Sequence, residues 1–281
     1  MSFLDRVRSA AEPRALGALV QRSLKHSDRS RGVYPALGEL ARRYGDAPDL
    51  TASELRVFSQ NGEDGVIAEI LRRIGTGSGG FVEFGIQDGT EGNTVFLAQV
   101  LGWSGLYLEA DDASFAALER RYSANPRVRT LHAAVEPDTV EALFAQAGVP
   151  EEPDLVSIDV DGNDYWIWRA LEAFRPRVVV VEYNGDLDPT VPKVMPYAPG
   201  WRWDHTSGYG ASLAALEALG TEKGYRLVHT ELAGVNAFFV REDLAAPLPA
   251  GEAVPRRSAS HSLLGHGHAP PRHEPEWQSG P

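Results

Sequence analysis

The sequence predicts an α/β fold built on a mostly parallel sheet. Between about Thr51 and Leu244, short runs of β-branched and aromatic residues alternate with stretches of helical period, which is the pattern of βα units. The last two strand-like runs, 225–230 and 235–240, are separated by four residues that include a glycine. Strands joined in this way form an antiparallel hairpin, so the sheet is expected to end with a reversed strand.

Each element is assigned from its local pattern, in chain order. The strand runs are rich in valine, leucine, isoleucine and aromatic residues, which favour strands. The helical runs carry apolar residues three or four positions apart, and Pro176 closes the fourth of them. Strands are expected at 80–85, 105–110, 128–135, 154–160, 177–183, 225–230 and 235–240, and helices at 90–101, 112–123, 138–147, 164–174 and 210–224.

Two further segments flank the predicted α/β domain, which spans residues 51–245. Residues 1–50 contain apolar positions at helical spacing, and we expect a helical extension that docks on the domain or on a partner subunit of a homo-oligomer. Residues 246–281 are rich in Pro, Gly, Ser and His without an apolar period. That composition predicts a disordered tail.

The charge and composition exclude several classes of protein. The chain holds 27 Lys and Arg against 39 Asp and Glu, a net charge of −12, and the excess acid repels phosphodiester backbones, so no nucleic acid is expected as a partner. No apolar run has the length of a membrane span, and the first residues do not read as a signal peptide, which favours a cytoplasmic protein without a membrane partner. The absence of cysteine excludes thiolate chemistry.

A glycine-punctuated turn follows the first expected strand. In an open parallel sheet, ligands bind beyond the carboxyl ends of the strands, and Gly85 would let a ligand approach the backbone there. The next glycine comes four residues later, which differs from the GxGxxG spacing of dinucleotide sites. Because Glu83 and Asp88 also add acid to the turn, a phosphate ester is not the expected ligand.

The ends of the second and third strands suggest a nucleoside site. Glu109 lies 24 residues after Gly85, where a doubly wound fold places an acid that accepts hydrogen bonds from ribose hydroxyls. Its alternative role is to cap the helix that begins near Asp111. Ala134 and Val135 follow the third strand and would form one wall of an adenine slot, although Val135 also suits the core.

These features together resemble a class I S-adenosylmethionine-dependent methyltransferase. Within that class, the order of the motifs SQNGEDGVIAEIL, FVEFGIQDGTEGNT, LYLEAD, SIDVDGNDYWIWRAL and VVVVEYN resembles the FkbM-type family over roughly residues 55–241. That family's glycine loop more often reads D-x-G-A-N-x-G, whereas this chain has E-F-G-I-Q-D-G. The resemblance implies a Rossmann-like sheet of seven strands and S-adenosylmethionine as the cofactor.

The resemblance also assigns roles in cofactor binding. It implies that Glu83, Gly85 and Asp88 border the methionine end of the cofactor and that Glu109 holds the ribose. Asn61 and Glu63 would cap the cofactor from outside, or would instead begin the helix that contains VIAEIL.

A run of acids at the end of the fourth strand suggests a metal site. Asp159 and Asp161 lie in this run, and Glu182 and Asn184 end the fifth strand. Carboxylate and amide oxygens from adjacent strand ends suit Mg²⁺, which would acidify the hydroxyl to be methylated. Without a metal, Asp159 would position the methionine amine of the cofactor, and Asp164 would cap the next helix.

Three other interpretations stay open at this stage. The run DVDGN resembles the nucleophile motif of haloacid dehalogenase-type phosphatases, but three strands precede it. Asp159 and Asp161 also match the DxD pair of metal-dependent glycosyltransferases, which leaves Glu109 and the reversed strand unexplained. The third interpretation is a methyltransferase-like binding module without activity.

The long connection 184–210 is the expected lid over the acceptor. It is far longer than ordinary αβ loops and is rich in Trp and Tyr, whose faces suit a sugar or another natural product. The acceptor is therefore expected to be a small molecule that is methylated on a hydroxyl oxygen. If no metal acts, His205 or Asp204 is the candidate general base, and a loop histidine such as His205 can also be merely solvated.

Overall fold

A seven-stranded sheet forms the centre of the computed structural model, which describes residues 49–260, 267–271 and 275–280. The strand order is β3-β2-β1-β4-β5-β7-β6, and β7 runs antiparallel to both of its neighbours while the other pairs are parallel. This confirms the predicted Rossmann-like sheet of the class I methyltransferase fold. The strands are β1 (Gly80–Phe84), β2 (Ser104–Glu109), β3 (Val128–His132), β4 (Leu155–Ile158), β5 (Val178–Glu182), β6 (Tyr225–Thr230) and β7 (Asn236–Arg241).

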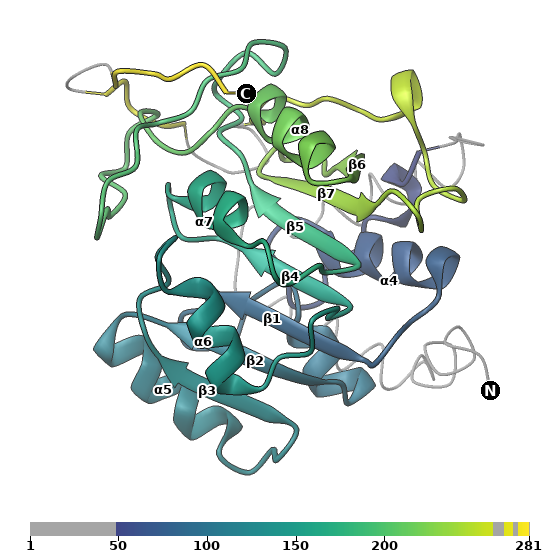
Figure 1. Ribbon diagram of the computed structural model, residues 1–281, viewed down its shortest axis with the longest axis vertical. Helices are drawn as coiled ribbons and strands as arrows, with labels where there is room; N and C mark the ends of the chain where they lie inside the picture. The colour runs from purple at the N-terminus through teal and green to yellow at the C-terminus, as the bar shows by residue number, and fades with distance from the viewer. Residues whose placement is uncertain (1–48, 261–266, 272–274, 281) are drawn as a thin grey trace.

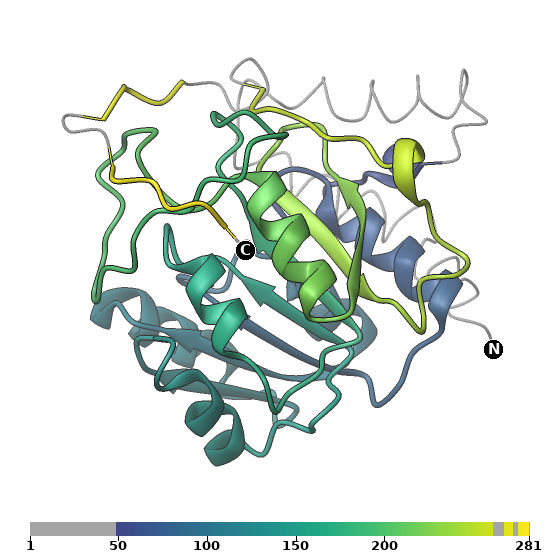
Figure 2. The same ribbon diagram turned by 45° about the horizontal axis from the view of Figure 1, so that its top comes forward.

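Helices cover both faces of the sheet. Figure 1 shows α6, α7 and α8 over one face, and Figure 2 shows the same layer after rotation. The residues of α4 and α5 belong to the hydrophobic cluster of the opposite face. The helices are α4 (Glu63–Ile74), α5 (Asp112–Tyr122), α6 (Val140–Ala147), α7 (Asp164–Ala170) and α8 (Leu213–Glu222), with short segments η1 (Thr51–Ser53), η2 (Leu97–Leu101) and η3 (Gly251–Ala253).

The valine run of β5 explains why both faces are apolar. Val179 and Val181 lie in the cluster beneath α6, α7 and α8, whereas Val178 and Val180 lie in the cluster beneath α4. All four are fully buried. A strand covered on both faces needs a continuous apolar run rather than alternation, and this is the run that the sequence shows.

Several predicted elements are shorter than expected. The predicted strand 128–135 ends at His132, and the predicted helix 164–174 ends at Ala170, because the backbone amides of Glu172 and Ala173 donate to the Glu141 side chain. The predicted helix 90–101 is found only in its second half: a loop takes the place of its first residues, and helical structure begins at Val95 and continues into the π-helical segment η2. The loop is longer than predicted because the Glu83 side chain of β1 accepts hydrogen bonds from its backbone.

The described part of the tail packs on the domain. Tyr183 donates a hydrogen bond to the carbonyl of Arg257 (2.7 Å), and the Ala259 amide donates to the Gly185 carbonyl (2.8 Å). Leu248 and Val254 are buried. These contacts come from single residues without an apolar period, so the composition of the tail did not predict them. The proposed domain boundaries stay a prediction, and residues 1–48 of the expected helical extension lie outside the described residues.

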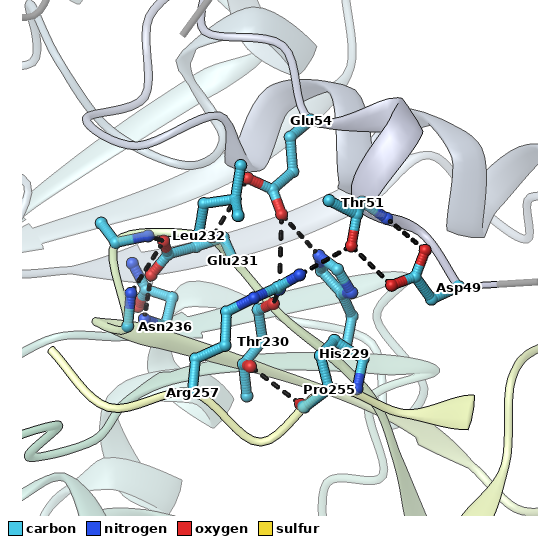
Figure 3. A network of polar contacts seen from close by, with 12 residues as sticks. Asp49, Thr51, Glu54, His229, Thr230, Glu231, Leu232, Asn236, Pro255 and Arg257 are labelled. Carbon is cyan, nitrogen blue, oxygen red and sulfur yellow. Dashed lines mark hydrogen bonds and ion pairs between the residues drawn. The ribbon is translucent and has the colours of Figure 1, made fainter. Parts of the chain in front are cut away.

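A buried polar network joins the start of the described chain, the β6–β7 hairpin and the tail (Figure 3). The Glu54 carboxylate lies 2.9 Å from His229 Nε2 and accepts a hydrogen bond from the Leu232 amide (3.0 Å). Arg257 lies 3.5 Å from the same carboxylate and donates to the Thr230 carbonyl. Burial raises the pKa of Glu54 to about 9, although the Leu232 amide and Arg257 oppose the shift.

No helix among the described residues is long and apolar enough to cross a membrane.

Candidate functional site

The carboxyl ends of β1, β2, β4 and β5 open into one cavity of about 1160 Å³. This is the edge of the sheet at which open α/β folds bind ligands. The lid loop and the tail form part of its wall. Of the residues predicted from the sequence, nine line it: Glu63, Glu83, Gly85, Asp88, Glu109, Asp159, Asp161, Glu182 and His205.

The loop after β1 is held in place by Glu83. Its carboxylate accepts hydrogen bonds from the backbone amides of Asn93 (2.7 Å) and Thr94 (3.0 Å) and from the Thr94 hydroxyl (2.6 Å). Burial raises the pKa of Glu83 to about 7, and the Thr94 and Asn93 donors oppose the shift. Glu83 therefore holds the loop backbone at residues 93 and 94, and the helix that the sequence predicts over 90–101 begins only after these residues.

Gly85 brings this loop close to the end of β4. Its φ is +71°, and a Cβ at this position would lie 1.8 Å from the carbonyl oxygen of Asp159. Only glycine allows this approach. Asp88, further along the loop, accepts hydrogen bonds from the Thr90 amide and hydroxyl, which shapes the turn at the cavity rim.

Glu109 connects the loops that follow β1 and β2. One carboxylate oxygen accepts from the Gln87 amide (2.7 Å) and the other from the Asp111 amide (2.8 Å). The side chain is 7% exposed and lines the cavity. Asp111, rather than Glu109, is the N-cap of α5, so the alternative helix-capping role of Glu109 is not seen. A carboxylate has about four acceptor positions. The two amides occupy two of them, so the other positions can accept hydrogen bonds from a ligand.

The segment before α4 closes the cavity beside β7. Glu63 is fully buried, accepts from the Asn61 amide (2.7 Å) and from Asn236 Nδ2 (2.8 Å), and lines the cavity. Asp64 accepts three backbone amides from the preceding loop, including that of Ser59. Burial raises the pKa of Asp64 to about 6. Asn61 itself is buried but is not part of the cavity wall.

Asp159, Asp161 and Glu182 converge at the centre of the site. Each offers a carboxylate oxygen, and these atoms lie within 4.8 Å of one another. Burial raises the pKa of Glu182 and of Asp159 well above the usual range, and the neighbouring carboxylates raise both further. Among the described residues, Glu182 Oε2 is buried without a hydrogen-bond partner. The acidic group of Asp159, Asp161 and Glu182 therefore resists ionisation on its own, and a bound cation would stabilise its charged form.

Besides Asn61, three predicted residues lie outside the site. Asn184 is not a ligand in the acidic group, because its Nδ2 donates to the carbonyls of Ser207 and Tyr209 and its Oδ1 accepts from the Asp186 amide. Asp204 accepts from Thr206 within the lid and does not line the cavity. Ala134 is exposed and is likewise not part of the cavity wall.

The lid places a cluster of rings over the acidic group. Trp203 packs against His205 (ring centroids 4.6 Å apart), Tyr209 (5.9 Å) and His268 (5.1 Å). All four residues line the cavity. His205 is exposed and has a φ of +65°. The sequence indicated the aromatic lid, but it did not place the tail residue His268 in the cavity.

Other cavity residues were also missed. Arg56 forms an ion pair with Glu91 at the rim (3.0 Å), and Asn236 joins Glu63 to the start of β7. Arg56 precedes the segment that the sequence highlighted, and Asn236 begins an otherwise apolar strand. The polar Asn236 at the first position of this apolar strand is the sequence signal that could have indicated a cavity residue.

The comparisons with known proteins found similar solved structures but no matching family model. No protein-family model matches the sequence, and no curated protein matches it. Solved structures similar to this chain include the N-terminal domain of EvdMO1 with S-adenosylhomocysteine (SAH) bound, at 14% identity and a TM-score of 0.40, over 63% of this chain and 79% of that one.

Two more structures are similar at the same level. TYW2 from M. jannaschii in complex with AdoMet has 16% identity and a TM-score of 0.36, over 62% of this chain and 75% of that one. TrmK from M. capricolum in complex with SAH has 9% identity and a TM-score of 0.37, over 62% of this chain and 65% of that one. Because these identities are low, the roles of the site residues follow from the residues of this chain alone.

Proposed function

We propose that this protein is an S-adenosylmethionine-dependent methyltransferase that methylates a hydroxyl group of a neutral small molecule, such as a sugar or another natural product. The observation that carries the proposal is the position of Glu109 at the end of β2. Two backbone amides fix its carboxylate at the cavity wall, and its remaining acceptor positions suit a pair of ribose hydroxyls. When bound, the cofactor would supply an electrophilic methyl group.

The chain's own residues account for the rest of the binding. The Gly85 backbone and the Asp159 carboxylate would border the methionine end of the cofactor. The acidic interior disfavours an anionic acceptor, and the ring cluster around Trp203 offers flat apolar faces to a sugar or similar ring. The protein would then act by holding the acceptor hydroxyl in line with the methyl group and by accepting its proton.

A divalent cation is the second part of the proposal. The residues that would hold it are Asp159, Asp161 and Glu182, whose carboxylate oxygens meet within 4.8 Å. The buried Glu182 Oε2 has no partner among the described residues, and a cation would offset the burial and the mutual repulsion that raise the pKa values of the group. Oxygen ligands of this kind suit Mg²⁺, which would polarise the acceptor hydroxyl.

Calorimetric titration tests the proposal against its main alternative. The protein is titrated with S-adenosylmethionine and, separately, with UDP-glucose, each with and without Mg²⁺. We expect S-adenosylmethionine to bind in the low micromolar range and UDP-glucose not to bind. Metal-dependent binding of UDP-glucose alone would favour the DxD glycosyltransferase interpretation, and it would contradict the methyltransferase proposal.

A further inference from the structure

The tail delivers a histidine to the acceptor side of the cavity. His268 Nδ1 lies 2.8 Å from the Asp186 carboxylate, and the side chains of His268 and Asp186 are 10% and 16% exposed. The next residue, Ala269, accepts a hydrogen bond from the Ser207 amide (2.8 Å) and forms a bridge with Thr206. The position of His268 is therefore set by both its side chain and its backbone.

Two aromatic rings fix the plane of the imidazole. Trp203 and Tyr209 meet His268 edge to face, with centroids 5.1 and 5.8 Å away and interplanar angles of 79° and 80°. Tyr209 also links His268 to the acidic group. Burial raises the pKa of Tyr209, and the nearby charges of Glu182 and Asp186 raise it further. His268 lines the same cavity as Asp159, Asp161 and Glu182.

The carboxylate partner determines what the imidazole can do. A carboxylate at Nδ1 favours the tautomer that carries its proton on Nδ1, so Nε2 holds the lone pair of the neutral ring. A base oriented by a third group is the usual arrangement for proton abstraction. His205 lacks this support, because among the described residues it makes no hydrogen bond or ion pair with a carboxylate and it is exposed.

We propose that Asp186 and His268 form the general-base pair for the acceptor hydroxyl, an inference that rests on the proposed methyl transfer. In this step the acceptor oxygen forms a bond to the methyl carbon as the S–CH₃ bond breaks, and that electron pair stays on sulfur, giving neutral SAH. The hydroxyl proton passes to Nε2 of His268. Asp186 stabilises the resulting imidazolium, which then releases its proton to solvent.

A kinetic experiment separates proton abstraction from a structural role. Methyl transfer is measured with two probes: 4-nitrophenyl β-D-glucopyranoside, whose hydroxyls need a base, and 4-nitrocatechol, whose acidic phenol ionises without one. We expect His268→Gln to lower kcat about a hundredfold or more with the sugar probe and only severalfold with the phenol. Asp186→Asn should show the same split. A loss of equal size with both probes, or wild-type kcat with the sugar probe, would overturn the assignment.

His132 provides the matched control. It also pairs with a carboxylate, that of Asp112 (3.3 Å), but it lies at the end of β3 and outside the cavity wall. His132→Gln should leave kcat with both probes unchanged. Affinity for SAH, measured on every variant, should equal that of the wild type. If the wild type itself does not bind SAH, the proposed function fails, and that result is distinct from failure of the base assignment.

A spectroscopic readout is independent of turnover. In protein labelled with ¹⁵N-histidine, we expect the neutral form of the His268 ring to carry its proton on Nδ1, and Asp186→Asn to weaken that preference. A neutral ring protonated on Nε2 would overturn the base assignment.

Discussion

Replacing Glu109 is the sharpest test of the cofactor site. Its two carboxylate oxygens hold the Gln87 and Asp111 amides at 2.7 and 2.8 Å, so Glu109→Ala removes both the proposed ribose acceptor and the anchor of the loop after β1. Losing a charged hydrogen-bond partner costs about 1.5 to 3 kcal/mol, which corresponds to a roughly tenfold to hundredfold higher Kd for S-adenosylmethionine. Calorimetric titration measures this change directly.

The control for Glu109→Ala is Asp111→Ala. Asp111 also binds two backbone amides, those of Ala113 and Ser114, as the N-cap of α5, but it does not line the cavity. Its loss should lower helix stability slightly and leave the Kd unchanged. Urea unfolding shows whether each variant is folded. A folded Glu109→Ala protein that binds the cofactor as tightly as the wild type would refute the site assignment.

Three further predictions concern the buried network, the metal and the tail. Arg257→Ala should lower the free energy of unfolding by about 1 to 3 kcal/mol in urea titrations, because it leaves the Thr230 carbonyl and the Thr51 hydroxyl of the buried network without their donor. Arg256→Ala, from a partly exposed ion pair, should change it by about 0.5 kcal/mol or less; equal effects would contradict this. EDTA should abolish methyl transfer and spare SAH binding, and Mg²⁺ should restore activity; transfer that persists in EDTA excludes the metal role. Truncation after Leu244 should lower the Tm by several degrees in a thermal melt, and an unchanged Tm would show that the tail contacts add nothing.

The sheet could be predicted because its pattern is local. The runs around Val178 and the four-residue hairpin connection specify buried parallel strands and a reversed last strand without reference to distant residues. The helix expected over 90–101 was wrong in its first half for the opposite reason. Glu83, ten residues before Asn93 in the chain, accepts a hydrogen bond from the Asn93 amide. Helix propensity depends on neighbouring residues and cannot predict such a contact.

The same distinction applies to the site. Acids at strand ends, such as Glu109 and Asp161, were predictable because parallel strands bring their carboxyl ends to one edge. The prediction that Asn184 is a metal ligand was wrong, because its side-chain amide donates to two carbonyls of the lid instead. His268 could not be predicted at all. Its partner Asp186 lies 82 residues earlier, in a loop whose course depends on tertiary contacts.

The charge of the cavity gives the last prediction. Acidic side chains outnumber the basic ones in its wall, and two of the arginines are paired with acids at the rim, Arg56 with Glu91 and Arg121 with Asp88. The acidic residues are Glu63, Glu83, Asp88, Glu91, Glu109, Asp159, Asp161 and Glu182, and the arginines are Arg56, Arg121 and Arg202.

This excess of acid should distinguish the two forms of the cofactor, because S-adenosylmethionine carries a sulfonium charge that SAH lacks. One unbalanced negative charge at about 6 Å and an effective dielectric constant of about 20 attracts a cation by about 3 kcal/mol, and by less than about 1 kcal/mol in water. We therefore expect S-adenosylmethionine to bind at least severalfold more tightly than SAH in EDTA. Since the pKa of Glu83 is about 7, this preference should grow from pH 6 to pH 8 as its carboxylate ionises. Calorimetry at both pH values measures the ratio, and equal affinities at pH 8 would show that the cavity presents no net negative charge to its ligand.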